Sequence, residues 1–273
     1  MGWGFRIFLG MKYLLLFFIL LNTGASGQNP GPRLVAMGSG GTALQGIWSL
    51  QQNPAGAAGL KKPAFAIAYE RQLQIPDLST QMALFIIPYR RNVLGFSFER
   101  YGITEYREQT AGLSYARNFG QAFRLAMAIK YFQLSIFQYG SANAFSIETG
   151  FQINITENFI IGSHIANPNR STYREFSGSN LPVKISLGAS VRFSDKVLMI
   201  ADLRKSLNHP LDVMTGVEYN VMKWFSLRGG ASVNPFKQYM GFELASNKLK
   251  FDFAVASHAS LGYSPQIALS YEF

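Results

Sequence analysis

The chain has 273 residues, with 25 Lys and Arg against 15 Asp and Glu, a formal net charge of +10 and no Cys. Charged residues make up only 15% of the total, whereas aromatic residues reach 14%. This composition excludes an intrinsically disordered chain, and the missing Cys excludes a disulfide scaffold and Cys-based metal sites. Beyond the N-terminus no apolar run approaches the roughly 20 residues of a membrane-spanning helix, so we expect a β-protein that faces lipid.

The N-terminal segment is typical of an export signal. Arg6 and Lys12 precede an apolar run at 13–21, and the small residues 25–27 form a cleavage site before Gln28. Met11 is an alternative start that gives a more compact signal, and a single membrane anchor is the alternative to cleavage. We expect residues 1–27 to be a signal peptide, whose removal leaves a net charge of 10 − 2 = +8.

Residues 28–62 do not alternate and are rich in small residues. Two motifs stand out: Ala-Met-Gly-Ser-Gly-Gly-Thr-Ala at 36–43, and Trp-Ser-Leu at 48–50 followed by Asn-Pro-Ala-Gly at 53–56. Small residues permit close backbone packing, and Asn-Pro begins a turn. We expect a hatch that plugs a wide barrel; a disordered periplasmic tail is the alternative. The hatch motif residues are Met37, Gly38, Gly40, Gly41, Trp48, Asn53, Pro54, Ala55 and Gly56.

From residue 63 to the end, segments of alternating character are separated by turns. In residues 64–70, for example, Phe65, Ile67 and Tyr69 share one face, as expected for a strand with two different faces. We expect about fourteen strands, each close to the length of a tilted transmembrane strand. They begin near Pro63, Thr80, Asn92, Tyr106, Phe123, Ala142, Phe159, Leu181, Val197, Leu211, Phe225, Gln238, Leu249 and Ser264.

The connections predict the orientation of the barrel. Every second connection is tight, as at Arg90-Arg91 and Glu157-Asn158, whereas we expect long loops at 167–180, 134–141 and 73–79. In outer-membrane barrels the short turns are periplasmic.

The two faces of the strands are inverted relative to a soluble protein. Charged residues mostly share a face with Ala, Gly and Ser, and the other face is almost uniformly Phe, Ile, Leu, Val and Tyr. A β-sandwich or a propeller would carry its charges on the outer face. We therefore predict an all-β fold, a transmembrane antiparallel β-barrel at residues 63–273, located in the outer membrane and in contact with its lipid.

The predicted lumen carries charges of both signs. A selective pore usually shows one sign, so we favour pairing of these groups with each other and with the hatch over a selectivity lining. The expected lumen-facing residues are Glu70, Glu99, Arg124, Lys130, Glu148, Lys184, Arg192, Glu218, Arg228, Glu243, Lys250 and Asp252.

The sequence offers no catalytic or cofactor signature. His164, His209 and His258 lie on separate segments, whereas a metal site requires three or four converging ligands. No Gly-x-Ser-x-Gly motif occurs. We expect no enzyme, no cofactor, no metal and, for an exported barrel, no nucleic acid partner despite the positive charge.

The last strand ends in an aromatic residue. Tyr271 and Phe273 close an amphipathic segment, which resembles the signal read by the barrel assembly machinery of the outer membrane. We therefore expect that machinery to be a partner of the chain.

The hatch motifs resemble the N-terminal hatch of the FadL-like superfamily of outer-membrane proteins, and within it the PorV/PorQ-type proteins of type IX secretion. Asn-Pro-Ala-Gly at 53–56 is the most specific element, and the strand ending at 113–117 and the closing hairpin at 256–273 are similar to that group. The acidic residues that often precede Trp-Ser in relatives are absent here, where 44–47 is Leu-Gln-Gly-Ile. The resemblance implies a barrel of fourteen strands.

The resemblance leaves two main hypotheses for the function, and a purely structural barrel without transport is a third possibility. The first is a PorV/PorQ-like protein that binds secretion-system proteins or exported cargo through its hatch and its loops at 167–180 and 134–141. The alternative is a FadL-like passive channel for hydrophobic small molecules, with Ile136 and Phe137 as candidates for an apolar outer groove.

Overall fold

The computed structural model describes residues 29–75, 77–173, 181–207, 209–258 and 262–273, so the expected signal peptide lies outside the described residues. Within these ranges no helix is long and apolar enough to cross a membrane. The strands are β1 (Ala64–Arg71), β2 (Ser79–Tyr89), β3 (Asn92–Gly102), β4 (Tyr106–Phe119), β5 (Phe123–Ile136), β6 (Gly140–Asn154), β7 (Phe159–Ala166), β8 (Lys184–Arg192), β9 (Val197–Ser206), β10 (Asp212–Met222), β11 (Phe225–Val233), β12 (Phe236–Ser246), β13 (Leu249–His258) and β14 (Gly262–Glu272).

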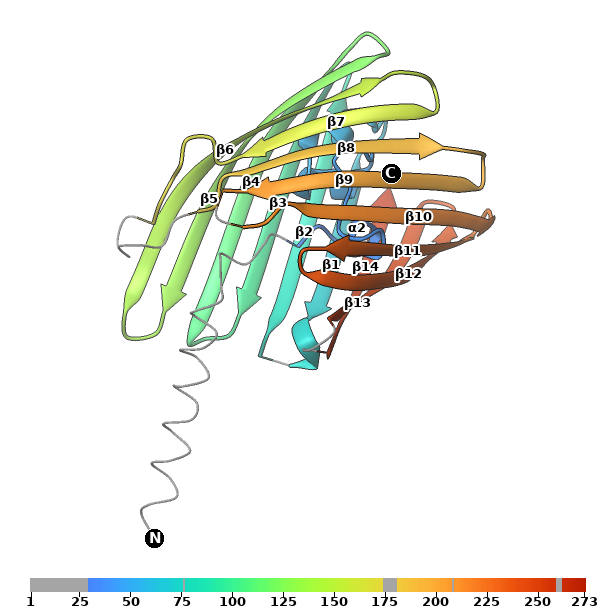
Figure 1. The fold of residues 1–273 in the computed structure, drawn as a ribbon. Coiled ribbons are helices and arrows are strands. Elements are labelled where there is room, and N and C mark those ends of the chain that lie inside the picture. Colours follow the sequence, from blue (N-terminus) through green and yellow to red (C-terminus); the bar gives the residue numbers. More distant parts are fainter. Residues whose placement is uncertain (1–28, 76, 174–180, 208, 259–261) are drawn as a thin grey trace.

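The strands close into a single antiparallel barrel (Figure 1). Each strand pairs with its neighbours in the sequence, and β1 pairs with β14 from Ala64↔Glu272 to Glu70↔Gln266. Closure leaves no sheet edge along the lipid, where an unpaired backbone group would find no water. The prediction of fourteen strands is confirmed, and their starts lie within a few residues of the expected positions.

The strand faces follow the alternation of the sequence. On β5, Leu125, Met127 and Ile129 are exposed, whereas Arg124 and Ala126 are buried toward the lumen. The large apolar side chains therefore form the outer, lipid-facing surface, as expected for a transmembrane barrel.

The two ends of the barrel differ. The turn rim carries the connections between β2 and β3, β4 and β5, β6 and β7, β8 and β9, β10 and β11, and β12 and β13, together with the end of β14. The loop rim carries the remaining connections, of which the one between β7 and β8, residues 167–183, is the longest.

One predicted loop is wrong. Residues 134–141 are not a loop, because pairing of β5 with β6 continues out to Ile136↔Gly140 and leaves only 137–139 as the connection. The polar residues Gln133, Ser135 and Ser141 lie on strands, where the alternating pattern turns them outward. In Figure 1 this yellow-green hairpin extends beyond β7 and β8 at the lower left.

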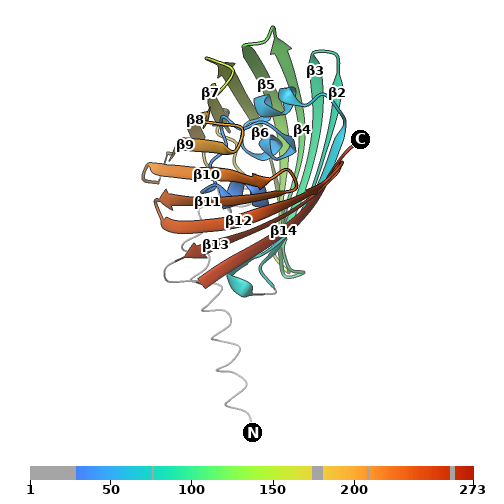
Figure 2. The same ribbon diagram turned by 90° about the vertical axis from the view of Figure 1, so that its right-hand side faces the viewer.

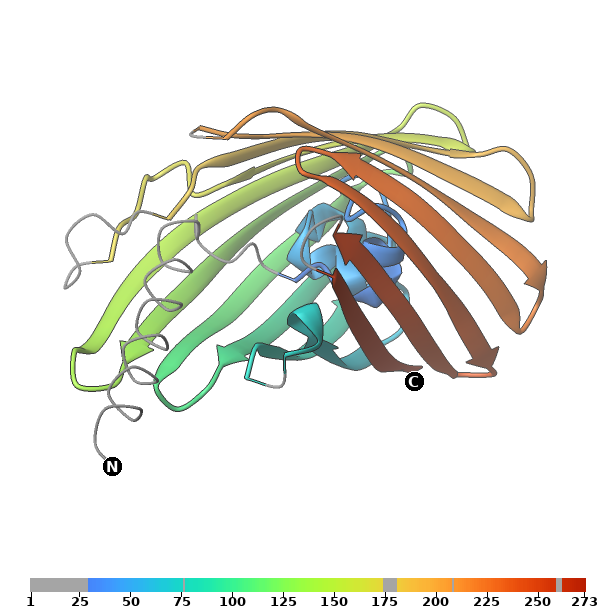
Figure 3. The ribbon, with the colours of Figure 1, turned by 60° about the horizontal axis from the view of Figure 1, so that its bottom comes forward.

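Residues 29–62 occupy the lumen (Figures 2 and 3). They contain α2 (Pro32–Ala36), η1 (Ile47–Gln51) and η2 (Pro54–Gly59), whereas η3 (Gln72–Gln74) lies between β1 and β2. The α2 helix contacts β11 to β14, and η2 contacts β3 to β6. The hatch, residues 29–62, thus bridges opposite walls of the barrel.

Candidate functional site

Glycines allow the hatch backbone to lie directly on the barrel wall. Gly216 and Gly230 face each other across β10 and β11. A Cβ atom on Gly216 would lie 2.5 Å from the carbonyl oxygen of Met37, and one on Gly230 would lie 2.2 Å from the amide nitrogen of Gly38. Gly38 itself has φ of +78°, which favours glycine. A larger residue at any of these positions would therefore force the hatch away from the wall.

The glycine loop of the hatch is held by β9. The backbone N–H groups of Gly41 and Thr42 donate to Oδ2 of Asp202 at 2.7 and 2.8 Å. Arg204 on the same strand completes the clamp, because its Nη2 donates to the carbonyl oxygen of Ser39 at 3.0 Å. A carboxylate that accepts two amide hydrogens in a buried site fixes the loop conformation strongly.

Asn53 begins the second hatch motif and joins three segments. Its Oδ1 accepts from the N–H of Ala55 at 3.2 Å, which caps η2. Its Nδ2 donates to the carbonyl oxygens of Thr42 at 2.7 Å and of Phe151 on β6 at 3.1 Å. Gln152 donates to the same Thr42 oxygen at 3.0 Å. These bonds tie both hatch motifs to one place on β6.

The other motif residues are buried in the hatch interior. Trp48 is 4% exposed and packs over Gly31, where a Cβ atom would lie 2.1 Å from the indole ring. Ala55 is fully buried beside Pro54, and a Cβ atom on Gly56 would lie 2.2 Å from the carbonyl oxygen of Leu44. Gly40 lies against Ile200 and Asp202 of β9.

A network of charges links α2 to the β10–β13 wall. Arg33 donates from Nε and Nη2 to the two carboxylate oxygens of Glu218 at 3.1 and 3.2 Å, and this carboxylate raises the pKa of Arg33. Arg228 binds Glu218 at 2.7 Å, and Glu243 and Asp252 at 2.5 Å each. The charges of this wall thus neutralise one another and the hatch.

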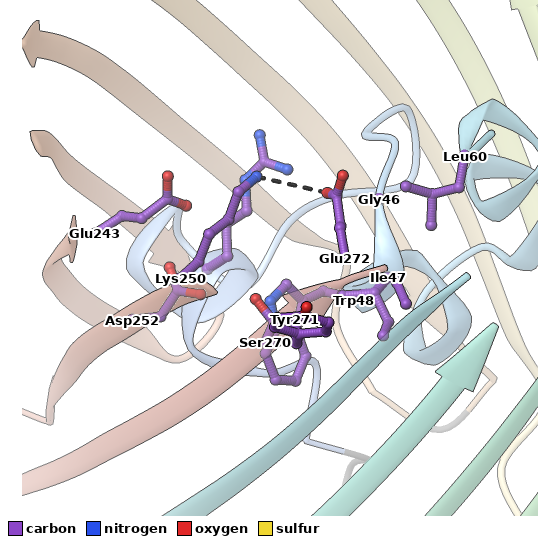
Figure 4. Close-up of a pocket in the computed structure, with 12 residues that line it drawn as sticks. Gly46, Ile47, Trp48, Leu60, Glu243, Lys250, Asp252, Ser270, Tyr271 and Glu272 are labelled. Carbon is purple, nitrogen blue, oxygen red and sulfur yellow. Dashed lines mark ion pairs between the residues drawn. The ribbon is translucent and has the colours of Figure 1, made fainter. Parts of the chain in front are cut away.

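A small cavity of about 40 Å³ lies beside this network (Figure 4). Gly46, Ile47 and Trp48 of the hatch line it from one side, and Lys250 and Glu272 of the last two strands from the other. The Lys250 Nζ lies 3.8 Å from Oε1 of Glu272. The volume is about that of one or two waters, so the hatch packs closely here.

Two further polar clusters lie in the lumen wall. Nζ of Lys130 is 3.0 Å, and Nε2 of His164 3.2 Å, from Oε2 of Glu148. Nearer the loop rim, Asn29 of the hatch donates to Glu70 at 2.6 Å and, through its backbone, to Glu99 at 3.4 Å. In the first cluster Glu148 is paired with a cation, whereas in the second the carboxylates accept hydrogen bonds from a neutral residue.

The faces of β5 and β6 exchange character near the loop rim. Phe132, Leu134 and Ile136 share the inner face with Lys130, and they pair with β6 beside Ala142 and Ala144. Leu134 is 8% exposed and Ala142 is fully buried. On the outer face the apolar residues give way to Gln133 and Ser135 on β5, and to Ser141 and Asn143 on β6. We name the inner set Phe132, Leu134, Ile136, Ala142 and Ala144 the loop-rim face.

The wall beside the loop-rim face is incomplete. β7 pairs with β6 only from Glu148 to Asn154. Within the described residues, the part of β6 nearer the loop rim therefore pairs with β5 on one side and with no strand on the other. Asn169 instead binds the N–H of Ile147 at 3.1 Å and the carbonyl oxygen of Phe145 at 3.0 Å. The loop-rim face is therefore framed by strands on one side and by a loop on the other.

The remaining residues expected in the lumen lie near its two ends. Lys184 is half-buried near the loop rim, and Arg192 is exposed at the turn rim. Sequence reasoning missed Asp202, Arg204 and Gln152 as anchors of the hatch, because their partners are backbone groups more than 100 residues away. It also missed His164 beside Glu148 and the apolar character of the loop-rim face, although the residue parity of β5 carried that signal.

The described residues hold no group of three or more His, Cys, Asp or Glu side chains that could bind a metal ion. No model of a known protein family matches the chain, and no curated protein matches its sequence. Solved structures do match. The Pseudomonas putida toluene transporter TodX has a TM-score of 0.69 at 10% identity, covering 91% of this chain and 99% of that one.

Two further solved structures match the fold of the chain over a similar length. The Ralstonia pickettii toluene transporter TbuX has a TM-score of 0.64 at 14% identity, covering 91% of this chain and 99% of that one. A Pseudomonas aeruginosa FadL homologue has a TM-score of 0.65 at 11% identity, covering 91% of this chain and all of that one (100%). At these identities the likeness shows the fold alone.

Proposed function

We propose that this barrel is a passive channel of the outer membrane for small apolar molecules, with the loop rim outside and the turn rim in the periplasm. The loop-rim face carries the proposal. A row of inward apolar side chains beyond the lipid belt gives an apolar solute a surface to bind on its way from water. The FadL-like fold supports the same conclusion, because TodX and TbuX are toluene transporters. Both are transporters rather than enzymes, which agrees with a non-enzymatic barrel.

The hatch keeps the lumen closed to polar solutes in this proposal. It spans the lumen, because α2 contacts β11–β14 and η2 contacts the opposite strands β3–β6. Hydrogen bonds from or to Asp202, Gln152 and Glu218 hold it to the wall. Hydrogen bonds and ion pairs of this kind hold a single conformation, so passage has to begin at the loop-rim face, where apolar side chains carry the contact.

Uptake of labelled toluene by cells tests the proposal. The chain is expressed in a Gram-negative host that lacks its own hydrocarbon channels, and the initial uptake rate is compared with that of the empty host and with that of a polar solute of similar size. We expect faster toluene uptake and unchanged uptake of the polar solute. A rate equal to that of the empty host, with folded barrel present in the outer membrane, would overturn the proposal.

A second candidate function is that of a PorV/PorQ-type partner in type IX secretion. The specific observation in its favour is the tip of the β5–β6 hairpin, where Phe137 is 62% and Tyr139 is 78% exposed. Exposed aromatic side chains suit a protein contact. Pull-down of the tagged chain from solubilised outer membranes, followed by mass spectrometry of proteins and lipids, separates the two functions: recovered secretion proteins or cargo favour this candidate, and a bound apolar molecule alone favours the channel.

The C-terminal aromatic residues fit a role in assembly. The N–H of Phe273 donates to the carbonyl oxygen of Pro63 at 3.0 Å, and its ring packs edge-on against Tyr271 at 5.0 Å between centroids. We propose that the barrel assembly machinery recognises this strand end. Deletion of Phe273 should lower the amount of heat-modifiable barrel in the outer membrane; an unchanged amount would contradict the assignment.

A further inference from the structure

A second, larger cavity of about 240 Å³ opens at the turn rim, between the hatch and the wall formed by β5 to β9. The hatch contributes residues 43–45 and Arg33 to its lining. The strand register places the wall residues side by side, because Ile160 pairs with both Asn154 and Ser190, and Arg192 pairs with Leu198. The cavity is thus built by adjacent strands rather than by a mobile loop.

Arg124 is the central charge of this cavity. Its residue is only 9% exposed, and its Nε has no hydrogen-bond partner. Nη1 donates to Oδ1 of Asn154 at 2.8 Å, and the Gln45 amide, oriented with its oxygen toward Arg124, accepts from Nη1 at 2.8 Å. Among the described residues no carboxylate lies within 4.0 Å of this guanidinium. A buried cation without a carboxylate partner is costly, and a bound anion would supply the missing counter-charge.

Two more guanidinium groups face the same space. Arg192 lines the cavity at the exposed end of β8, and within the described residues it has no ion-pair partner. Arg33 also lines it, although Glu218 already binds that group. Glu157 is the single carboxylate in the lining. The net charge of the side chains that line the cavity is therefore positive.

The floor of the cavity is apolar. Leu44 of the hatch and Leu198 of β9 are 4% and 7% exposed, and Ile160 of β7 completes this side. The cavity therefore pairs an arginine-rich wall with an apolar floor, which suits a ligand that has one oxyanion group and a small apolar part.

We propose that this cavity, the turn-rim pocket, binds a phosphate or carboxylate group on Arg124 and Arg192. The planar guanidinium forks of the two residues match the geometry of such oxyanions. The anion comes either from a free inorganic ion or from the head of an amphiphile whose apolar part covers the floor. The inference is independent of the channel proposed above, because it concerns binding at the opposite rim and requires no passage through the barrel.

Calorimetric titration of the full-length barrel in a non-ionic detergent tests the pocket. The probes are inorganic phosphate, hexyl phosphate and hexanol, and folding is checked by heat-modifiable mobility. The variants are Arg124→Gln and Arg192→Gln, with Arg117→Gln as matched control on the outer face at the same rim. Arg192→Gln keeps the test valid if Arg124→Gln fails to fold, because Arg192 is exposed.

We expect hexyl phosphate to bind, hexanol not to bind, and each pocket variant to weaken binding about tenfold or more, while the control leaves it unchanged. Equal binding of phosphate and hexyl phosphate identifies a free anion as the ligand, and tighter binding of hexyl phosphate identifies an amphiphile head. Absence of binding by both, or binding unaffected by either pocket variant, would overturn the inference. Neither result alters the toluene uptake that tests the channel.

Discussion

The β5–β6 hairpin carries two regions with opposite faces. Toward the turn rim, Met127 and Ile129 face outward and Lys130 and Glu148 face the lumen. Toward the loop rim, Gln133 faces outward, and the inner face is apolar. The strand geometry is the same in both regions, so the difference reflects the surroundings: lipid outside and a polar hatch inside in the first, and water outside in the second.

This comparison separates the two tasks of the barrel wall. Where the hatch lies, the wall supplies hydrogen-bond donors such as the Gln152 amide, and these bonds stabilise the polar lumen. Beyond the lipid belt an outward apolar side chain on these strands would be in contact with water. The apolar residues of this part of β5 and β6 therefore lie on the inner face. We infer that the first region holds the hatch and the second contacts solutes.

The largest loss of stability is expected when a buried ion pair of the first region is broken. Lys130→Met removes the ammonium group 3.0 Å from the Glu148 carboxylate and leaves the His164 imidazole at 3.2 Å, and breaking such a buried pair costs about 3–5 kcal/mol. Urea unfolding of the barrel in detergent measures this loss. Lys196→Met, at an exposed turn position, should change stability by less than about 0.5 kcal/mol. Equal stability of both variants would show that the pair does not support the wall.

Arginine substitutions on the outer face of β5 probe the boundary of the lipid belt. Met127→Arg places a charge in lipid and should destabilise the inserted barrel by about 2–4 kcal/mol. Gln133→Arg, on the same strand and face, should cost less than about 1 kcal/mol because the side chain reaches water. Unfolding from lipid vesicles measures both. Similar costs at the two positions would contradict the exchange of faces.

A substitution in the hatch motif is expected to cost less stability than these two changes in the barrel wall. Asn53→Ala removes the bonds to Thr42 and Phe151 and the cap of η2, which should destabilise the hatch by about 1–3 kcal/mol without unfolding the barrel. Hydrogen exchange of residues 29–62 should then quicken relative to the strands. Gln121→Ala, at an exposed turn, is the control. Unchanged exchange in the Asn53 variant would show that this residue does not anchor the hatch.

The smallest free-energy effect is expected when a polar side chain is placed on the loop-rim face, and it is measured as toluene uptake. Leu134→Asn removes apolar contact with a solute and should lower toluene uptake about tenfold, the effect of roughly one lost apolar contact. Ser135→Asn, the next residue and outward-facing, should leave uptake unchanged. If both variants take up toluene at the wild-type rate, the loop-rim face is not part of the path.

The barrel itself was predictable from the sequence because strand alternation is a local property. The fourteen strands follow from runs such as 64–70, in which each side chain reports its own face. The loop expected at 134–141 was wrong for a related reason. Polar residues such as Ser135 and Ser141 are typical of loops, although here they occupy the outward positions of strands that extend beyond the lipid.

The anchors of the hatch could not be predicted in the same way. Asp202 and Arg204 bind backbone groups of residues 39–42, and no local pattern in β9 records those partners. The motif at 36–43 indicated close packing, but the wall glycines that receive it, Gly216 and Gly230, are remote in sequence. Such pairings depend on the register of the closed barrel.

The exchange of faces on the β5–β6 hairpin can be measured most directly by spin labelling, which is simple because the chain contains no Cys. Labels attached to Met127→Cys, Gln133→Cys and Leu134→Cys in lipid vesicles are probed with oxygen, which concentrates in lipid, and with a water-soluble nickel chelate. The account predicts that the label at 127 meets oxygen, the label at 133 meets the chelate, and the label at 134 is shielded from the chelate relative to 133. A label at 133 that responds like the one at 127 would contradict the account.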